Sequence, residues 1–557
     1  MTFRRPAIGS NVLTALVAAY VLLLCNFTFW GKLAEQFAGH PVKLVLFGVI
    51  LFLLYAVFLM IFSARYVIKL VFIAVVMIAA SVAYFTDTFG TIMDRDMIQN
   101  AAQTTGAESS NLITAEFLLH MLAFGIVPGL LIAWVQVVHP PFWQQVRRNT
   151  LFGFGMVALA GAILLVNLRT YVPFWQRQRE ITMAYLNPAM ALVATVDYGI
   201  HEMRDANLVA RPYGEDARIG PRLAAAKKKM LTVLVVGETA RAQNFSLNGY
   251  ERDTNPELSA RNVVAFTNVT SCGTATAISL PCMFSHLGRD GYSKRAALSS
   301  ENLVDVLQHA GLTVEWWENN TGPKSVADRI PTTLLNSKDA QYDPALCDGG
   351  ECLDQVLVDK LRARLDSLQG NAVLVLHTMG SHGPAYYERY PEAFEHFKPS
   401  CREAELNDCT PQELVNVYDN TILYTDHILA AIIDVLKERE GEFASAMYYM
   451  SDHGESLGEN GLYLHGAPYF LAPETQKRVP FITWFSDDFA STTGLDVSCL
   501  RGKTGDGFSH DNMFDTILGM MDVQTSVYNP KLDAFASCRN GVISRGDAGQ
   551  NGAVAVK

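Results

Sequence analysis

The sequence predicts two structural parts in one chain: five membrane-spanning helices, followed by a soluble α/β domain with a mixed, mostly parallel central sheet. Residues 1–170 are almost continuously apolar, whereas residues 200–557 have an ordinary globular composition. In the second part, apolar β-branched runs alternate with helix-like segments, the pattern of a sheet covered on both faces. We expect a transmembrane domain over 1–170, a bridging segment over 171–229, a soluble domain over 230–540 and a disordered tail over 541–557.

The membrane part rests on composition and length. Half of all residues are hydrophobic and 18% are charged, below the roughly 25% of an average soluble domain. Five stretches approach the ~20 apolar residues that span a bilayer: 11–30, 43–62, 66–85, 114–138 and 150–168. A cleavable signal peptide would give one short apolar run, so the first stretch is predicted to be an anchor.

Basic residues predict the orientation of these spans. They gather before the first span, between the second and third, and between the fourth and fifth: Arg4, Arg5, Arg65, Arg147 and Arg148. The other connections before the fifth span hold only Lys32 and Arg95. The positive-inside rule therefore places the N-terminus in the cytoplasm and, after five spans, the soluble part outside.

Cysteine positions agree with an outside location. Cys25 lies inside the first span, and the other eight cysteines fall in the C-terminal part. Short loops favour three local pairs and leave one longer pair: Cys272 with Cys282, Cys347 with Cys352, Cys401 with Cys409, and Cys499 with Cys538. Eight cysteines allow 105 connectivities, so the pairing is a preference. Disulfides persist in oxidising compartments; zinc ligation is the alternative, but no paired CxxC motif is present.

The segment from Arg169 to Glu215 connects the two parts. Its aromatic residues alternate with Arg and Gln, as expected of helices that lie in a lipid headgroup layer. A plain linker with helical turns is the alternative. The net charge of −11 without a basic run argues against a nucleic-acid partner.

Three apolar runs in the soluble part are predicted strands. They begin LTVLVVGE at 231, NAVLVLHTMGSHG at 371 and SAMYYMSDHG at 445, with predicted helices over 301–310, 353–368 and 411–438. Each strand ends in polar residues, and sites in open α/β sheets lie beyond the carboxyl ends of strands.

Residues that follow the first and third strands predict a metal site. Glu238 follows the first strand, and Asp452 and His453 follow the third. Carboxylates with an imidazole suit Zn²⁺, which in catalytic sites takes three protein ligands and keeps one open position. An isolated Asp-His pair is a weak signal, but DHGES directly after a strand, together with GETAR after another, favours a metal centre.

The segment SCGTATAISLPCMFS offers a nucleophile for the open position. Thr274, Thr276 and Ser279 are the candidates. A threonine hydroxyl is a poor nucleophile at neutral pH unless a metal lowers its pKa. If the segment begins a helix, its backbone N–H groups would face a reacting phosphate. An ordinary Thr/Ala-rich helix start is the alternative.

Further polar residues fit a phosphate-handling site. His382 in HTMGSHGP and His465 in LYLHGAP lie among glycines and prolines, so both are expected on loops. Loop histidines can ligate a second metal, bind phosphate or protonate a leaving group. Lys324 could hold a phosphoryl oxygen, and Asn320 and Thr321 of the same ENNTGPK segment are predicted to bind substrate. Each of these could instead be an ordinary solvated loop residue.

The membrane part has a polar feature of its own in MIQNAAQTTGAESSN. Asn100, Thr104 and Glu108 recur every four positions, so on a helix they would form one polar face. An acid with hydroxyl and amide neighbours could bind an ammonium headgroup. A capping and loop segment is the alternative.

Taken together, these motifs resemble the lipid A phosphoethanolamine transferases, the family that includes the mobile colistin-resistance enzymes. The resemblance covers essentially the whole chain, and the motifs occur in the family's order: QNAAQTTGAE, GETAR, SCGTATAISLPCMFS, WWENNTGPK, HTMGSHGP and SDHGESLGENGLYLHGAP. It implies five spans, bridging helices and a catalytic domain like those of alkaline phosphatases and sulfatases.

The resemblance also implies roles for residues. Zinc would be held by Glu238, Thr276, Asp452 and His453, and Thr276, the second threonine of CGTAT, would carry the phosphoethanolamine covalently. His382, His465 and Lys324 match positions that contact the phosphate group or a second zinc. Asn100, Thr104 and Glu108 match positions for the ethanolamine end. Gly291 is a departure, because some relatives carry an acid there.

The implied activity is a zinc-dependent, ping-pong transfer of phosphoethanolamine from phosphatidylethanolamine to a phosphate of lipid A, which would confer polymyxin resistance. The chain is expected to be a monomer in the bacterial inner membrane with its catalytic domain in the periplasm. One tightly bound zinc is expected, and whether a second zinc takes part in turnover is an open question at this point. One alternative keeps the donor but modifies lipopolysaccharide core sugars or periplasmic glucans. A second alternative is hydrolysis by a sulfatase or phosphatase; sulfatases mature a Cys or Ser to formylglycine in a C/S-x-P-x-R context, which CGTATAISLP lacks. A third is a non-catalytic sensor, which would not need these residues intact.

Overall fold

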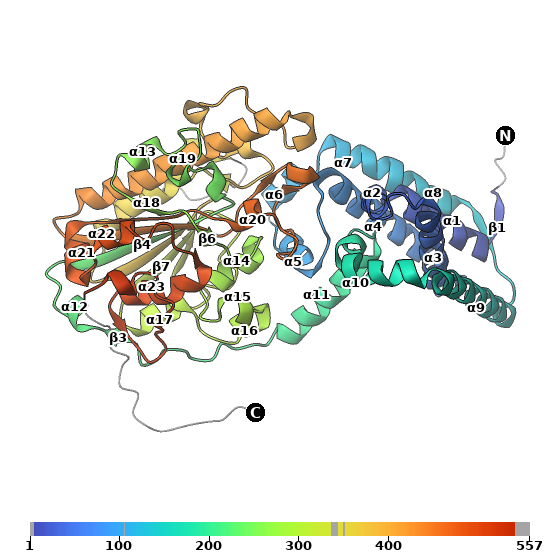
Figure 1. The fold of residues 1–557 in the computed structure, drawn as a ribbon, viewed down its shortest axis with the longest axis horizontal. Helices are drawn as coiled ribbons and strands as arrows, with labels where there is room; N and C mark the ends of the chain where they lie inside the picture. Colours follow the sequence, from blue (N-terminus) through green and yellow to red (C-terminus); the bar gives the residue numbers. More distant parts are fainter. Residues whose placement is uncertain (1–4, 105, 336–343, 349–350, 541–557) are drawn as a thin grey trace, which may run out of the picture. The chain divides into compact units, whose positions relative to one another are not determined.

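The computed structural model describes residues 5–104, 106–335, 344–348 and 351–540, with the backbone alone at 107, 108, 178–181, 344 and 348. The predicted tail over 541–557 lies outside the described residues. The chain forms two compact units, Met1–Ile98 with Leu112–His201 and Gln99–Asn111 with Glu202–Lys557. The helices of the first unit and the sheet of the second can be followed by their labels in Figure 1. The domain boundaries predicted from the sequence stay a prediction.

The first unit consists mainly of apolar helices. Their bounds are α1 (Ser10–Leu24), α2 (Phe27–Gln36), α3 (Pro41–Met60), α4 (Ile68–Phe89), α7 (Ala115–His120), the π-helix Met121–Ile126, α8 (Val127–Trp134), α9 (Phe142–Val166) and α10 (Leu168–Ala184). Strands β1 (Ala7–Gly9) and β2 (Gln136–Val138) pair in parallel. Many of the apolar side chains on these helices are exposed, as expected of a surface that faces lipid.

The predicted apolar membrane part is confirmed, while the number of five spans stays a prediction. Among the described residues, four helices are long and apolar enough to cross a membrane, or five if the pair α1 and α2 counts as one span. That pair covers the first predicted span but bends by 70°. At the bend, the amide of Asn26 donates to Val21 O at 2.9 Å and to Asn187 O at 3.0 Å. A side chain that takes a carbonyl of the helix competes with the next backbone bond, which explains why α1 ends here.

The connecting and polar segments are helical. α10 and α11 (Ala189–Asp205) fill most of the predicted bridging segment; their place in a headgroup layer stays a prediction. The polar segment forms two helices, α5 (Arg95–Gln103) and α6 (Gly106–Leu112). Asn100 lies on the first helix, Glu108 on the second and Thr104 between them, and the Thr104 hydroxyl donates to Asn100 O at 3.0 Å; their role in binding a headgroup stays a prediction.

A seven-stranded mixed sheet organises the second unit. The strand order is β5-β15-β12-β4-β11-β7-β8. The strands are β4 (Lys229–Gly237), β5 (Val264–Phe266), β7 (Thr313–Glu318), β8 (Thr332–Leu334), β11 (Ala372–His377), β12 (Phe443–Ser451) and β15 (Phe481–Phe485). The pairs from β12 to β8 are parallel, while β15 runs antiparallel to both β12 and β5. The predicted mixed, mostly parallel sheet is confirmed.

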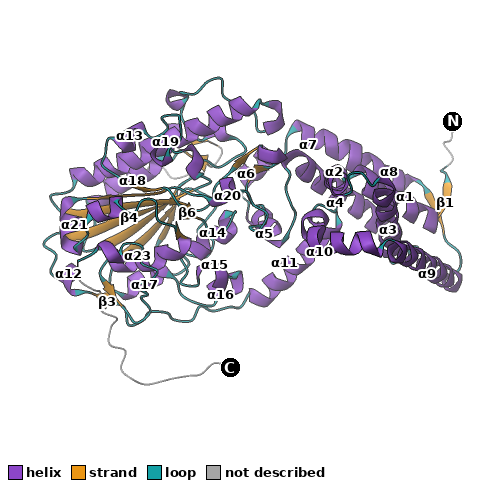
Figure 2. Cartoon of the chain, viewed as in Figure 1, coloured by secondary structure: helices purple, strands orange, loops and turns teal. Residues whose placement is uncertain are grey.

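Burial on both faces explains the apolar strand sequences. Met230, Leu234 and Val236 of β4 belong to a core cluster that includes α17 (Leu303–His309) and α23 (Met513–Met520). The intervening residues of β4 point to the opposite face, where α18 (Gln355–Leu365) and α19 (Pro411–Glu438) lie (Figure 2). α19 begins with a capping box formed by Thr410 and Glu413.

The remaining helices of the second unit are short. They are α12 (Pro221–Ala224), α13 (Pro256–Ser259), α14 (Thr276–Met283), α15 (Gly288–Gly291), α16 (Lys294–Leu298), α20 (Glu474–Lys477), α21 (Asp487–Thr493) and α22 (Val497–Arg501). Two-stranded pairs complete the unit, among them β6 (Val269–Thr270) with β16 (Phe508–Ser509).

All four predicted disulfides are confirmed. The second unit contains Cys272–Cys282, Cys347–Cys352, Cys401–Cys409 and Cys499–Cys538, and Cys25 is unpaired. The first of these bridges encloses the start of α14, so it fixes the turn that carries the candidate nucleophile.

Candidate active site

Polar residues meet at the carboxyl ends of four adjacent strands. Glu238 follows β4, and Asp452 and His453 follow β12, whose last residue Ser451 pairs with Gly237. β11 and β7 end next to them, in His377 and Glu318, which are paired in register. Because parallel strands bring their carboxyl ends to one edge, residues far apart in sequence form one site.

Glu238, Asp452 and His453 form a compact cluster. One ligand atom from each lies within 4.8 Å of the others, and all three residues are fully buried. Nε2 of His453 lies 3.3 Å from Oε1 of Glu238 and 3.5 Å from Oδ2 of Asp452. The other ring nitrogen, Nδ1, lies 2.9 Å from the Gly454 carbonyl, which orients Nε2 toward the carboxylates.

The electrostatics of this cluster favour a cation. Burial would raise the pKa of Glu238, but the hydrogen bond and charge of His453 hold it well below its usual range. Burial and the neighbouring Glu238 raise the pKa of Asp452 to about 6. Two carboxylates therefore share one imidazole. Oδ2 of Asp452 is buried and accepts no hydrogen bond from the described residues; Nε2 of His453 approaches it only to 3.5 Å.

Thr276 faces this cluster from the first position of α14. Its hydroxyl oxygen lies 3.1 and 3.3 Å from the two carboxylate oxygens of Glu238 and 3.3 Å from Nε2 of His453. The predicted helix start is confirmed. The side chain is buried, 5% exposed, so little water can compete for the hydroxyl.

The other two candidate hydroxyls are engaged elsewhere. Thr274 donates its hydroxyl to Ala467 O at 2.6 Å, and Ser279 donates to the carbonyl of Asp452. Of the three candidates, Thr276 alone directs its oxygen at the carboxylate–imidazole cluster. The geometry thus selects one hydroxyl where residue types left three open.

A buried network behind Glu238 fixes its carboxylate. The amide of Asn320 donates to Oε2 of Glu238 at 2.7 Å and to Thr378 O at 2.9 Å. Oε1 of Glu318 accepts the backbone N–H of Asn320 at 2.9 Å and lies 2.9 Å from Nδ1 of His377. Asn320, predicted to bind substrate, therefore lies against a candidate metal ligand.

Gly380 closes the same side of the site. A Cβ on this residue would lie 2.7 Å from the Glu238 carbonyl oxygen, and its φ is +54°. Asp354 accepts the N–H groups of Met379 and Gly380 at 2.8 and 2.9 Å. The HTMGSHG turn thus approaches the end of β4 closely because glycine is present at this position.

The two predicted loop histidines lie together. The ring centroid of His465 lies 5.7 Å from that of His382 and 4.5 Å from that of His453. Nδ1 of His465 lies 2.9 Å from Oε2 of Glu455, whose Oε1 accepts the Tyr386 hydroxyl at 2.5 Å. Burial lowers the pKa of His382 to about 3, so His382 is neutral at physiological pH.

Lys324 lines a cavity beside the nucleophile helix. The cavity measures about 280 Å³, and Gln99, Gln103, Ala277 and Tyr292 also line it. The Lys324 ammonium donates to Thr321 O at 3.0 Å. Thr321, which was predicted to bind substrate, therefore contacts Lys324 through its backbone carbonyl. Glu202 and Asp205 line the same cavity and pair with Lys294 and Arg295.

The polar segment reaches α14 through a residue that the sequence did not single out. The amide of Gln99 donates to the carbonyl of Ala277, the residue after Thr276, at 3.2 Å. Asn100 and Thr104 follow Gln99 on the chain and are partly exposed. The side chain of Glu108 lies outside the described residues. A Cβ added to Gly291, the position where some relatives carry an acid, would meet only Leu287, at 3.8 Å.

Backbone strain marks the loops around the site. Four non-glycine residues next to or among the site residues have positive φ: Thr239 at 59°, Lys324 at 48°, Ser325 at 67° and Leu464 at 60°. Such conformations cost about 1–3 kcal/mol each and persist where the surroundings impose them. Thr239 follows Glu238 and Leu464 precedes His465, so the strain accompanies the placement of both side chains.

Sequence reasoning missed several supporting residues. His377 ends the strand predicted from residue 371, and Glu318 ends the neighbouring strand β7. The strand-end argument that found Glu238 could therefore have found both. Glu455 lies inside the DHGES motif. His510, which contacts both halves of the site, lies in a short SHDN segment with no such signal.

Comparisons with known proteins agree with this architecture. Residues 231–523 match the sulfatase family model, and residues 50–203 match the model of phosphoethanolamine transferases EptA and EptB. The chain is 39% identical to phosphoethanolamine transferase EptA of Escherichia coli K12 over 547 residues, which cover 96% of this chain and 98% of the relative. It is 36% identical to the phosphatidylethanolamine transferase Mcr-1 of Escherichia coli, covering 93% and 96%.

A solved structure is similar over the same extent. The integral membrane protein lipooligosaccharide phosphoethanolamine transferase A of Neisseria meningitidis superposes with a TM-score of 0.91 at 37% identity, covering 96% of this chain and all of that one. Fold, site and similarity together define a membrane-anchored phosphotransferase with an alkaline-phosphatase-like domain. The chain belongs to the EptA/EptB family of phosphoethanolamine transferases. The family resemblance and the fold class predicted from the sequence are both confirmed.

Proposed function

We propose that this chain transfers phosphoethanolamine from phosphatidylethanolamine to a phosphate of lipid A through a covalent intermediate on Thr276. The observation that carries the proposal is the convergence of Glu238 and His453 on the Thr276 hydroxyl, within 3.1–3.3 Å. The relative Mcr-1 is named a phosphatidylethanolamine transferase, which supports the donor. The motif resemblance to lipid A transferases supports the acceptor.

The residues present fit a zinc ion. Glu238, Asp452 and His453 offer two carboxylates and an imidazole with ligand atoms within 4.8 Å, and Oδ2 of Asp452, which accepts no hydrogen bond from the described residues, is the oxygen that such an ion would take. Thr276 would supply the fourth position, as in catalytic zinc sites with three protein ligands. When bound, zinc supplies a Lewis acid that lowers the pKa of the hydroxyl and neutralises charge on phosphoryl oxygens.

In the first half-reaction, the Thr276 oxygen attacks the phosphorus of phosphatidylethanolamine. A threonine O–P bond forms, the bond from phosphorus to the diacylglycerol oxygen breaks, and that oxygen takes a proton as diacylglycerol leaves. Asn320 and the turn at Gly380 hold Glu238 in place during this step. Because Thr276 opens α14, its N–H group and that of Ala277 precede the first helical hydrogen bonds, which Ile278 and Ser279 make to Ala275 O, and they are proposed to face the phosphoryl oxygens.

In the second half-reaction, a phosphate oxygen of lipid A attacks the same phosphorus and the Thr276 oxygen leaves. His465 is fixed by Glu455 and His382 is neutral because burial lowers its pKa to about 3. Either ring can hold a phosphoryl oxygen or carry the proton that moves between the leaving and attacking oxygens. A second metal ion at His465 is compatible with the cluster of His453, Glu455 and His465, whose ligand atoms also lie within 4.8 Å.

The cavity beside α14 suits the headgroup. Lys324 offers a cation for the phosphate, and the polar segment with Asn100, Thr104 and Glu108 is proposed to receive the ethanolamine end. Gly291 contributes no acid, so this recognition is proposed to rest more on Glu108. Adding an amine lowers the net negative charge of lipid A, which weakens the binding of cationic peptides such as polymyxin.

We further propose an inner-membrane location with the catalytic unit in the periplasm. Apolar helices anchor the first unit, and four disulfides in the second unit require an oxidising compartment. The lipids of the outer leaflet are then within reach of the site.

Mass spectrometry of lipid A from cells that express the chain tests the acceptor. We expect lipid A carrying phosphoethanolamine with the wild-type chain and unmodified lipid A with Thr276→Ala. New mass on core sugars or glucans, with unmodified lipid A, would refute the acceptor while keeping the donor chemistry. Free phosphoethanolamine with no modified lipid would indicate a hydrolase, and full resistance with Thr276→Ala would indicate a sensor.

A further inference from the structure

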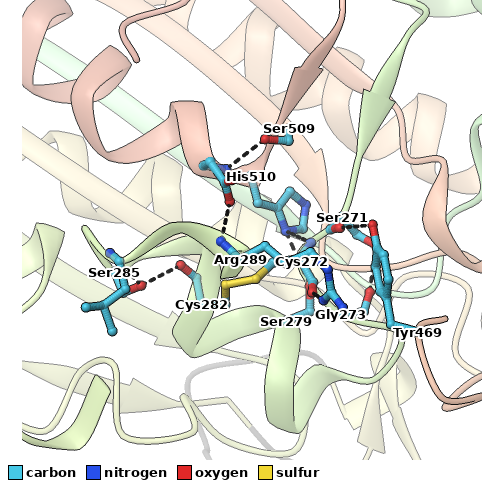
Figure 3. Close-up of a disulfide and its surroundings, with 12 residues drawn as sticks. Ser271, Cys272, Gly273, Ser279, Cys282, Ser285, Arg289, Tyr469, Ser509 and His510 are labelled. Carbon is cyan, nitrogen blue, oxygen red and sulfur yellow. Dashed lines mark hydrogen bonds between the residues drawn. A yellow bond between two sulfur atoms is a disulfide. The ribbon is translucent and has the colours of Figure 1, made fainter. Parts of the chain in front are cut away.

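His510 lies between the two halves of the candidate site. It begins the 3-10 turn His510–Asn512 directly after β16, and it is 1% exposed. On one side is the segment that leads to Thr276, and on the other is the end of β12, which leads to Asp452 and His453. Figure 3 shows its ring directed at Cys272 and Ser279.

Both nitrogens of the ring have backbone partners. The N–H of Cys272 donates to Nδ1 at 3.1 Å, and Nε2 lies 3.0 Å from the carbonyl of Ser451. Since Nδ1 accepts an N–H, it carries no proton, and the proton on Nε2 is donated to Ser451. Burial lowers the pKa of His510 to about 4, which agrees with a neutral ring held as one tautomer.

The two backbone partners lead directly to the reacting groups. Cys272 is four residues before Thr276 and is bridged to Cys282 on the same helix. Ser451 immediately precedes Asp452, and its hydroxyl donates to His453 O at 2.9 Å and accepts from the N–H of Ala240 at 2.8 Å. His510 thus connects the nucleophile turn with the loops after both β12 and β4.

The turn around His510 is itself fixed. β16 pairs in parallel with β6, the strand that precedes Cys272. Ser509 and Asn512 form a reciprocal capping box around the turn. Asp511 accepts the backbone N–H of Arg289 at 2.9 Å, and the Arg289 side chain donates to the Cys272 carbonyl. The ring therefore has little freedom to change its orientation.

We propose that His510 is a positioning residue that sets the separation between the Thr276 hydroxyl and the Glu238–Asp452–His453 cluster. The inference rests on the proposed function, because it gives Thr276 the role of nucleophile. The contacts place His510 against the backbone of both halves and against Ser279 at 3.3 Å. It acts through the groups that it holds.

Three variants of the full-length protein test the inference. His510→Leu removes both hydrogen bonds, His510→Asn keeps an acceptor for Cys272 N–H, and His510→Gln keeps a donor for Ser451 O. The matched control is Ile517→Val in the core beside the same turn, which lowers stability without touching either hydrogen bond. The measurements are the rate of phosphoethanolamine attachment to Thr276 at saturating phosphatidylethanolamine, the KM for that lipid, the zinc content and the melting temperature.

We expect His510→Leu to slow attachment by about 100-fold, the scale of a displacement of about 1 Å at a reacting group. The KM for the lipid should stay within about threefold, and zinc should remain bound. His510→Asn and His510→Gln should each recover part of the rate, while Ile517→Val should lower the melting temperature and keep the wild-type rate.

Two results would overturn the inference. One is attachment by His510→Leu at the wild-type rate; the other is a loss of rate in Ile517→Val that matches His510→Leu at equal loss of stability. If His510→Leu does not fold, equal wild-type rates in His510→Asn and His510→Gln decide against it. If Thr276 stays unmodified in the wild-type protein, the proposed function fails and the inference fails with it. If Thr276 is modified in the wild-type protein and at the same rate in His510→Leu, only the inference fails.

Discussion

The hydroxyl oxygen of Thr276 lies 3.1 Å from Oε2 of Glu238, although 38 residues separate them. The same carboxylate oxygen accepts the amide of Asn320 at 2.7 Å. One carboxylate therefore joins the candidate nucleophile to the loop after β7. The predictions below follow from this arrangement and from its supports.

Removal of one candidate ligand should release the metal. We expect His453→Ala to weaken zinc binding by more than about 100-fold, beyond the loss caused by residues that merely support ligands. The domain should stay folded, because its core and disulfides are untouched. Zinc content measured on purified protein checks this, with His427→Ala as control, since His427 pairs with Glu257 on α13. Full zinc stoichiometry in His453→Ala would contradict the ligand set.

Loss of the amide behind Glu238 should have a smaller effect. Asn320→Ala is expected to weaken zinc affinity or transfer by about 10–100-fold, the range for groups that orient metal ligands. The control is Asn371→Ala, which removes a side chain that accepts the N–H of Met230 at 2.9 Å, at the amino ends of the strands. Zinc titration of both variants measures the difference. Equal affinities in Asn320→Ala and wild type would show that this hydrogen bond does not support the ligand.

Two disulfides of similar loop length separate stability from function. Cys272–Cys282 and Cys401–Cys409 close segments with sequence separations of 10 and 8. Replacing either pair by serine should lower the free energy of unfolding by about 2–3 kcal/mol in the chain-entropy account, which is model-dependent. Only the first replacement should also slow Thr276 modification, by about 100-fold, because it frees the nucleophile turn. Equal rates in both double variants would argue that the bridge does not position Thr276.

The contribution of His510 to stability should fall as the pH falls below about 6.5. Burial lowers the pKa of His510 to about 4 from its ordinary 6.5, so between these values the unfolded chain binds a proton that the folded chain does not. Unfolding is then favoured at lower pH, by about 2 kcal/mol for this residue between pH 7.5 and 5. His510→Gln should remove that share of the dependence. Unfolding measured in detergent at both pH values checks it, and an unchanged slope in the variant would show that His510 titrates normally.

The sequence predicted the cluster of Glu238, Asp452 and His453 because each of these residues follows a strand whose apolar pattern is local. It could not choose among Thr274, Thr276 and Ser279 by chemistry alone, because the choice depends on which hydroxyl points at Glu238. Asn26 shows a second limit: hydropathy counts apolar length, but a side-chain amide bends the first span.

Supports formed by distant segments were also beyond the sequence. His510 is 238 residues from Cys272, and its role depends on a tautomer fixed by the Ser451 carbonyl. The Glu318–His377 pair depends on the neighbouring positions of β7 and β11 in the sheet. Strand order and side-chain direction settle both, and neither leaves a periodic pattern in the residues.

The most direct test of the account is the mass of the peptide that contains Thr276 after the purified protein has met phosphatidylethanolamine without an acceptor. We predict that this peptide gains one phosphoethanolamine group as diacylglycerol appears, and that lipid A then removes the group. Diacylglycerol and modified lipid A formed at the full rate, with Thr276 unmodified throughout a quenched time course, would contradict the covalent mechanism.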